Sequence, residues 1–264
     1  MPNRQNDQSF QIMTAAPITL SRLRLEVSAH LLVAAPLVVA SALVLAGMME
    51  LPAWYAAAAL GAFCVVAGLA WMGLPGHLNH GGWGTANRIT LLRGGLIALV
   101  GGALPLAPGM AAEQAWMLAV IALVALALDG VDGWIARRQG MCSPYGARFD
   151  MELDALLILL LSLLLYLWGE AGVWVLGLGL MRHLFILAGM VWPVLAGPLP
   201  FSQRRRAICV VQVAVLAAGA SPWMEPPLTG VAAGAALALL LFSFTTDTVW
   251  LIRHGGRANG TEHG

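Results

Sequence analysis

Four aspartates at fixed spacing are the residues of this chain best suited to chemistry. Asp129 and Asp132 are three residues apart, and Asp150 and Asp154 are four apart, so on helices each pair shares one face. The long apolar runs that flank the cluster contain no charged residue. Carboxylates beside such sequence are costly unless they have a counter-charge. A divalent metal is the simplest one, and hard oxygen ligands favour Mg²⁺, Mn²⁺ or Ca²⁺ over zinc.

The residues around these acids favour a phosphate-containing ligand. Mg²⁺ keeps open coordination positions for substrate phosphates, which indicates phosphoryl or phosphatidyl transfer. Arg137 would supply a fixed cation for a phosphate group. Three small residues lie one helical turn from the acids and leave room for a bulky ligand, although such residues also serve close helix packing in membranes. They are Gly133, Ala136 and Gly146.

The composition is that of an integral membrane protein. The 264 residues are 59% hydrophobic and 10% charged, whereas a soluble domain carries about 25% charged residues. The apolar runs are long and do not alternate, which favours spanning helices over a closed barrel. The three cysteines are far apart and fit neither a disulfide framework nor a zinc site. A net charge of +1 gives no indication of a nucleic-acid partner.

Length and breaker residues predict eight spans with both termini in the cytoplasm. Every basic residue is an arginine, and all except Arg93 and Arg182 fall in segments that this topology places in the cytoplasm. The opposite loops contain no arginine. The aspartates would then lie at the cytoplasmic face; a six-span protein with two apolar hairpins is the alternative. The predicted spans are 28–48, 53–74, 88–106, 113–137, 147–168, 172–194, 206–220 and 228–252.

The aspartate segment resembles a known family signature. The pattern Asp-x2-Asp-Gly-x2-Ala-Arg-x8-Gly-x3-Asp-x3-Asp between Asp129 and Asp154 is similar to that of the CDP-alcohol phosphotransferases, membrane enzymes of phospholipid synthesis, and every fixed position matches. The run Asn87 to Arg93 resembles the Asn-x-x-Thr-x-x-Arg opening of their first core helix. The basic run 204–206 resembles their later basic loop. The likeness covers about residues 85–252.

The resemblance implies an all-α membrane protein with a six-helix core and two additional N-terminal transmembrane helices. The expected parts are a cytoplasmic segment 1–27, the additional helices in 28–84, the core in 85–253 and a cytoplasmic tail 254–264. A bacterial inner membrane, with the active site at its cytoplasmic face, is the expected location. Family members often form homodimers, and the sequence does not show whether this chain does.

The resemblance also implies roles for individual residues. Asp129, Asp132, Asp150 and Asp154 would bind Mg²⁺ or Mn²⁺, as one ion or two, and the metal would hold the CDP pyrophosphate. Asp154 would also act as general base on the acceptor hydroxyl. The hydroxyl would attack the β-phosphate of CDP-diacylglycerol or another CDP-alcohol, releasing CMP. The nucleotide would be bound by Asp129 and by Asn87, Thr90, Gly133, Ala136, Arg137 and Gly146.

The acceptor alcohol is less well defined than the reaction. Arginines near the cytoplasmic face favour a phosphorylated acceptor, with glycerol 3-phosphate first and a phosphatidylserine-type activity second. Most of the candidate arginines also have an alternative role. Arg182 could pair with an acid for structural reasons, and the run 204–206 could anchor the protein to anionic lipids. Arg93 could bind the nucleotide phosphates or Asp129. The candidate acceptor-binding residues are Arg93, Arg148, Arg182, Arg204, Arg205 and Arg206.

Two other classes of function compete with an enzyme. A proton-coupled transporter also uses acids within the membrane, but it needs them along the membrane normal rather than clustered at one edge. An inactive membrane scaffold would be expected to have lost some signature residue, and none is missing. The sequence therefore favours a transferase that works with membrane lipids.

Overall fold

A computed structural model describes residues 19–75, 82–139, 143–197, 199 and 202–258. The side chains of residue 132 and of 134–139 and 255–258 are outside this description. In the described part the chain forms eight α-helices and no strand. They are α1 (Leu20–Met48), α2 (Tyr55–Trp71), α3 (Gly84–Gly102), α4 (Ala112–Gln139), α5 (Pro144–Leu167), α6 (Leu176–Val191), α7 (Gln203–Gly219) and α8 (Leu228–Ala258).

The helix ends follow local sequence signals. The hydroxyl of Ser143 accepts a hydrogen bond from the N–H of Gly146 at 2.9 Å, and Pro144 follows at the first helical position, so α5 starts with a side-chain cap. Gly169, at φ 75°, lies just beyond the end of α5. Thr19 caps α1, which begins at Leu20, eight residues before the start of the predicted span.

Among the described residues, five helical segments are long and apolar enough to span a membrane, and they overlap α1, α3, α4, α6 and α8. The apolar helix α2 is shorter. Helix α5 carries Asp150 and Asp154 of the signature in its first half, and three arginines follow the first residue of α7, Gln203. The chain is therefore an all-helical integral membrane protein, in agreement with the sequence. Each of the eight predicted spans overlaps one helix, but the count of eight membrane spans and their division into six core and two additional spans stay predictions.

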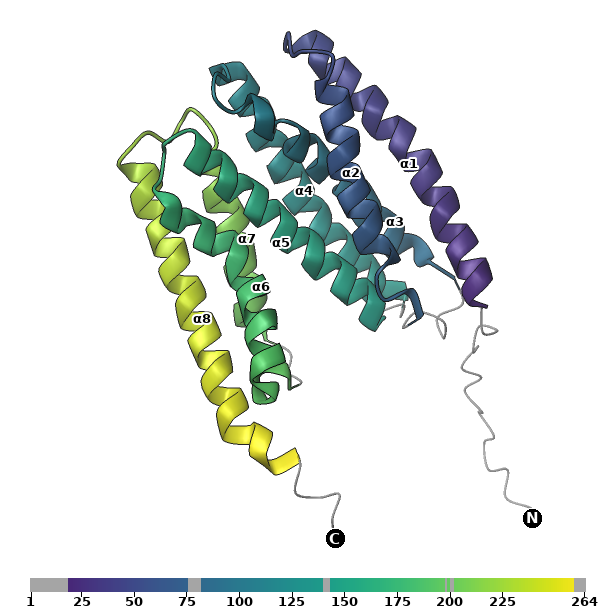
Figure 1. Cartoon of the computed structure of the whole chain (residues 1–264), viewed down its shortest axis with the longest axis vertical. Coiled ribbons are helices and arrows are strands. Elements are labelled where there is room, and N and C mark those ends of the chain that lie inside the picture. The colour runs from purple at the N-terminus through teal and green to yellow at the C-terminus, as the bar shows by residue number, and fades with distance from the viewer. Residues whose placement is uncertain (1–18, 76–81, 140–142, 198, 200–201, 259–264) are drawn as a thin grey trace, which may run out of the picture.

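The helices run lengthwise side by side, with α1 at one edge and α6 and α8 at the other (Figure 1). In the most apolar stretch of α3, 61% of the residues are buried, whereas only 17% are buried in that of α1. Helix α3 is therefore central and α1 peripheral. The start of α1 and the end of α8 lie at the same end of the molecule, whereas the α1–α2, α3–α4, α5–α6 and α7–α8 connections lie at the other (Figure 1). This arrangement has the connectivity that the predicted topology requires.

Glycines allow close helix contacts on both sides of the core. A methyl group at Gly102 of α3 would lie 2.7 Å from the backbone of Ala59 in α2. A methyl group at Gly179 of α6 would lie 2.4 Å from Cα of Leu159 in α5. Larger residues at these positions would separate the helices, which is why small residues are favoured at helix contacts in membranes. The tight packing fixes α3 and α5, the helices that carry most of the site.

Candidate functional site

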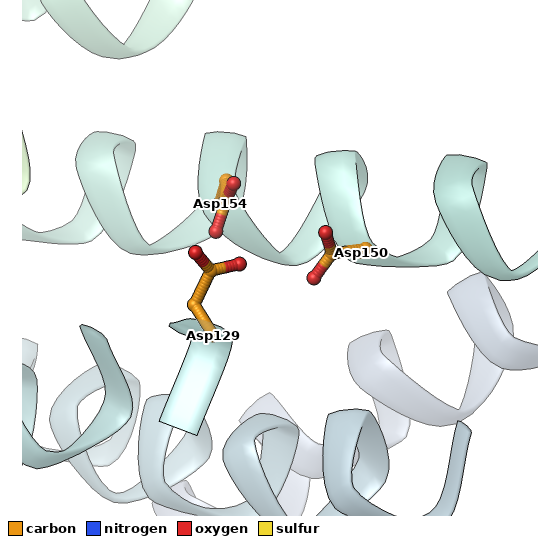
Figure 2. Close-up of side chains that lie close together, drawn as sticks. All are labelled: Asp129, Asp150 and Asp154. Atoms are coloured by element: carbon orange, nitrogen blue, oxygen red, sulfur yellow. The ribbon is translucent and has the colours of Figure 1, made fainter. Parts of the chain in front are cut away.

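Three carboxylates converge between α4 and α5. One oxygen from each of Asp129, Asp150 and Asp154 lies within 4.8 Å of the others. Asp150 and Asp154 are on the same face of α5, one turn apart, and Asp129 points toward them from α4 (Figure 2). The convergence that the three- and four-residue spacing predicts is therefore present for these three acids.

Arg93 of α3 lies at the centre of this group. Its Nη1 donates to Asp129 Oδ1 at 2.9 Å and to Asp154 Oδ1 at 2.6 Å. Its Nη2 donates to the carboxylate and to the backbone carbonyl of Asp150. The arginine side chain is 1% exposed. A planar guanidinium with several fixed donors suits such multiple pairing, and a lysine would not reproduce it.

Among the side chains that the structure describes, the charges of this group do not balance. One guanidinium faces three carboxylates there, and the side chains of Asp129, Asp154 and Asp150 are only 12%, 21% and 33% exposed. Uncompensated charge is expensive in such surroundings. A divalent cation would supply the missing positive charge, and a cluster of carboxylate oxygens is the donor set that Mg²⁺ and Mn²⁺ prefer. The residues present therefore fit a divalent metal.

Cys209 of α7 is a neighbour of the site that sequence reasoning missed. Its thiol donates to Asp154 Oδ2 at 3.4 Å. An isolated cysteine has no motif that would have identified it. The sequence feature that could have indicated it is the three-residue spacing between Cys209 and Gln212, which places both residues on one face of α7. Gln212 is also buried.

The beginning of α3 presents three buried polar residues toward the core. Asn87, Thr90 and Arg93 are spaced by three residues and are 6%, 3% and 1% exposed. Asn87 donates to the carbonyl of Trp83 at 2.5 Å, and Thr90 donates to the carbonyl of Ala86 at 3.0 Å. These bonds to the preceding turn hold both side chains against the helix.

Gly146 of α5 lies directly against Asn87. A methyl group at Gly146 would be 2.8 Å from Asn87 Oδ1 and 3.2 Å from Ser143 Oγ. Asn87 and Gly146 are thus in contact, although they are 59 residues apart in the chain (146 − 87). The predicted nucleotide-binding residues Asn87 and Gly146 therefore meet at the α3–α5 contact in which Arg93 also binds Asp150 and Asp154. Thr90 lies between Asn87 and Arg93 on α3.

Three of the other candidate acceptor-binding arginines pair with acids outside the carboxylate group. Arg182 of α6 donates to Glu152 at 2.7 Å. Arg204 and Arg205 pair with Asp247 of α8, at 2.5 and 3.4 Å. Arg148 is exposed and Arg206 half-buried. Structural pairing, which the sequence left open for Arg182, is thus present, though with Glu152 rather than with an aspartate of the cluster.

Several predicted site residues cannot be placed. The side chains of Asp132, Ala136 and Arg137 lie outside the described part of the chain, while their backbone belongs to α4. Gly133 is half-buried on the same helix. Their roles stay predictions.

Comparisons with known proteins give one result. A family model described as CDP-alcohol phosphatidyltransferase matches residues 83–246, which is more than half of the chain. No curated protein and no solved structure matches it. The matched segment contains the three converging aspartates and Arg93, and it begins at Trp83, one residue before α3.

Proposed function

The chain belongs to the CDP-alcohol phosphatidyltransferase family, and from that premise we propose that it transfers a phosphatidyl group from CDP-diacylglycerol or a related CDP-alcohol to an alcohol acceptor, releasing CMP. The observation that carries the proposal is the convergence of Asp129, Asp150 and Asp154 around Arg93. Because the acids form one compact group, they suit a single metal site, to which one phosphate-containing ligand could bind. A transporter would need them spread along the membrane normal.

Asp129, Asp150 and Asp154, with Asp132, would hold one or two ions of Mg²⁺ or Mn²⁺. The bound metal would supply charge stabilisation for the pyrophosphate of the donor. Arg93 balances part of the carboxylate charge and fixes the orientation of all three acids. We therefore assign Arg93 to the carboxylates rather than to an acceptor.

Asp154 would act as general base. It takes the proton of the acceptor hydroxyl, and the oxygen of that hydroxyl forms a bond to the β-phosphorus of the donor. The bond from that phosphorus to the bridging oxygen breaks, and CMP leaves with the electron pair. The Arg93 and Cys209 contacts hold the two oxygens of Asp154 from different sides. They thereby restrict the carboxylate to one orientation.

Nucleotide binding is assigned to the α3–α5 contact and to the beginning of the signature. Asn87 and Thr90 are buried at the start of α3, and Gly146 packs directly against Asn87. Gly133, Ala136 and Arg137 would complete the binding of the donor from α4. The diacyl tail would remain in the bilayer while the CDP head reaches the cytoplasmic face.

The preferred acceptor in this proposal is glycerol 3-phosphate. Arginines 148, 182 and 204–206 provide cations outside the carboxylate group, which suits an anionic alcohol. Because Arg182, Arg204 and Arg205 already contact acids, a phosphate would bind there by exchanging with Glu152 or Asp247. A phosphatidylserine-type activity is the alternative within the family.

The proposed architecture is a six-helix core at 85–253 preceded by two additional helices in 28–84, with cytoplasmic segments at 1–27 and 254–264. The active site and both termini would face the cytoplasm of a bacterial cell. The start of α1 and the end of α8 lie at the same end of the molecule (Figure 1), which supports placing both termini on one side of the membrane.

An acceptor screen tests the proposed function. Purified protein is given CDP-diacylglycerol and Mg²⁺ or Mn²⁺, and CMP release is followed with glycerol 3-phosphate, inositol phosphate, serine and choline. We expect release with glycerol 3-phosphate and no release without metal. Release with serine alone would support the alternative acceptor, and the absence of release with every acceptor would overturn the transferase proposal.

A further inference from the structure

Glu26 of α1 contacts the start of α3, although it lies outside the segment that the family model matches. Its Oε2 accepts a hydrogen bond from the backbone N–H of Trp83 at 3.2 Å, and its Oε1 accepts one from Arg88 at 3.3 Å. Trp83 is the N-cap residue of α3 and provides no side-chain cap of its own. The carboxylate thus satisfies a backbone donor at a helix start and places negative charge there, and both effects stabilise that end of the helix.

Trp83 is linked to both additional helices, to α1 directly and to α2 through Tyr145. Its side chain is fully buried, and the ring of His30 in α1 lies 5.2 Å from it. On the other side, Trp83 Nε1 donates to the hydroxyl of Tyr145 at 3.1 Å, and that hydroxyl donates to the carbonyl of Ala70 in α2 at 2.5 Å. The additional helices therefore hold one tryptophan from two directions.

The same tryptophan determines the position of Asn87. The carbonyl of Trp83 accepts the hydrogen bond from the Asn87 amide at 2.5 Å, and Gly146 packs against the other end of that amide. A displacement of Trp83 would therefore move Asn87 relative to α5. These contacts connect α1 to the proposed nucleotide site through one buried residue.

We infer that Glu26 is a positioning residue for the nucleotide site, and that the two additional helices serve to fix the start of α3 through Trp83. The inference rests on the proposed function for its kinetic consequence, because it assigns Asn87 to the donor. It gives the additional helices a specific role at the site, for which the sequence offered no chemical signal.

The test compares variants of the full-length protein in detergent micelles. Glu26→Ala removes both contacts, Glu26→Gln keeps an oxygen that can accept from Trp83, and Arg88→Ala removes only the exposed ion pair. Glu113→Ala is the control for loss of an acid at a helix start, because Glu113 lies in the first turn of its own helix, α4, and is exposed. Each protein is measured for CMP release at varied CDP-diacylglycerol and for amide hydrogen exchange in residues 83–90.

We expect Glu26→Ala to raise the KM for CDP-diacylglycerol about three- to tenfold, the size of a lost helix cap, with kcat within about twofold of the wild type. Its amides at the start of α3 should exchange faster. Glu26→Gln should restore most of the KM, while Arg88→Ala and Glu113→Ala should match the wild type. This separation of KM from kcat, with rescue by glutamine, would not follow from a general loss of stability.

Unchanged KM and unchanged exchange in Glu26→Ala would overturn the inference, and so would an equal fall of kcat in all variants. If Glu26→Ala does not fold, the KM and the amide exchange of Glu26→Gln are compared with those of Arg88→Ala instead. A wild-type protein without CMP release would overturn the proposed function instead. Exchange at Trp83 would still decide whether Glu26 holds the start of α3, since exchange needs no turnover.

Discussion

The guanidinium of Arg93 donates to the carboxylate of Asp154 at 2.6 Å, although the two residues are 61 positions apart in the chain. Arg93 comes from α3 and Asp154 from α5, so this contact joins the two helices at the level of the carboxylate group. The arginine is 1% exposed, which means that solvent screens the contact little. Any change in either residue should therefore affect both the stability of the α3–α5 contact and the proposed chemistry.

Arg93→Ala should destabilise the protein and abolish turnover. Removal of one partner leaves the other charges of a buried group uncompensated, at a cost of about 3–5 kcal/mol. Arg93→Lys should recover part of the stability but little activity, because one ammonium cannot replace the planar set of donors. Thermal unfolding in detergent and CMP release are the measurements. Arg88→Ala, whose parent side chain is 52% exposed, is the control, and unaltered melting and rate in Arg93→Ala would contradict the assignment.

Asp154→Asn should lower kcat by about 10²- to 10⁴-fold, the usual contribution of a general base. Binding of the CDP-alcohol should be largely preserved. Asp129→Asn should weaken both binding and turnover, since Asp129 is assigned to metal and nucleotide without a proton-transfer role. Equilibrium binding of the donor and steady-state kinetics separate the two variants. Normal turnover in Asp154→Asn would show that another group accepts the proton.

Cys209→Ala should reduce kcat a few-fold, with little change in the KM for the donor. The thiol is a weak donor to Asp154 Oδ2, so its loss leaves one carboxylate oxygen less restricted. Cys209→Ser retains a donor and should keep more activity than the alanine variant. Cys64→Ala provides the comparison, because Cys64 is exposed on α2. Equal rates in Cys209→Ala and Cys209→Ser would remove Cys209 from the account.

Gly146→Ala should raise the KM for the CDP-alcohol. The added methyl group would lie 2.8 Å from Asn87 Oδ1, and Asn87 is held in place by its bond to Trp83, so the amide must move. Gly68→Ala is the matched control, because a methyl group there meets nothing within 4 Å and alanine favours the helix. Kinetics at varied donor concentration distinguish the two. An unchanged KM in Gly146→Ala would argue against nucleotide binding at this contact.

The convergence of the aspartates was predictable because it depends on short-range geometry. The spacing of Asp150 and Asp154 fixes their common face once the segment is helical, and the apolar runs on either side predict the helices. The position of Asp129 opposite them follows from the short connection between α4 and α5. The number of helices was likewise predictable, since it depends on the length of apolar runs and on breaker residues.

Partners that come from distant helices were less accessible to sequence reasoning. The pairing of Arg93 with three acids depends on the rotation of α3 about its axis, which the sequence of α3 alone does not determine. Arg182 pairs with Glu152 rather than with an aspartate of the cluster, because α6 packs against the side of α5 that carries Glu152. The contact of Glu26 with Trp83 joins residues 57 positions apart and has no local signal.

The most direct test of the account is the location of bound Mn²⁺ by anomalous diffraction from crystals grown with Mn²⁺ and a CDP-alcohol. The account predicts an anomalous peak within coordination distance of Asp129, Asp150 and Asp154, with the pyrophosphate of the donor beside it. The peak should be lost in Asp129→Asn crystals grown in the same way. A donor bound elsewhere in the protein, or Mn²⁺ bound away from these three carboxylates, would contradict it.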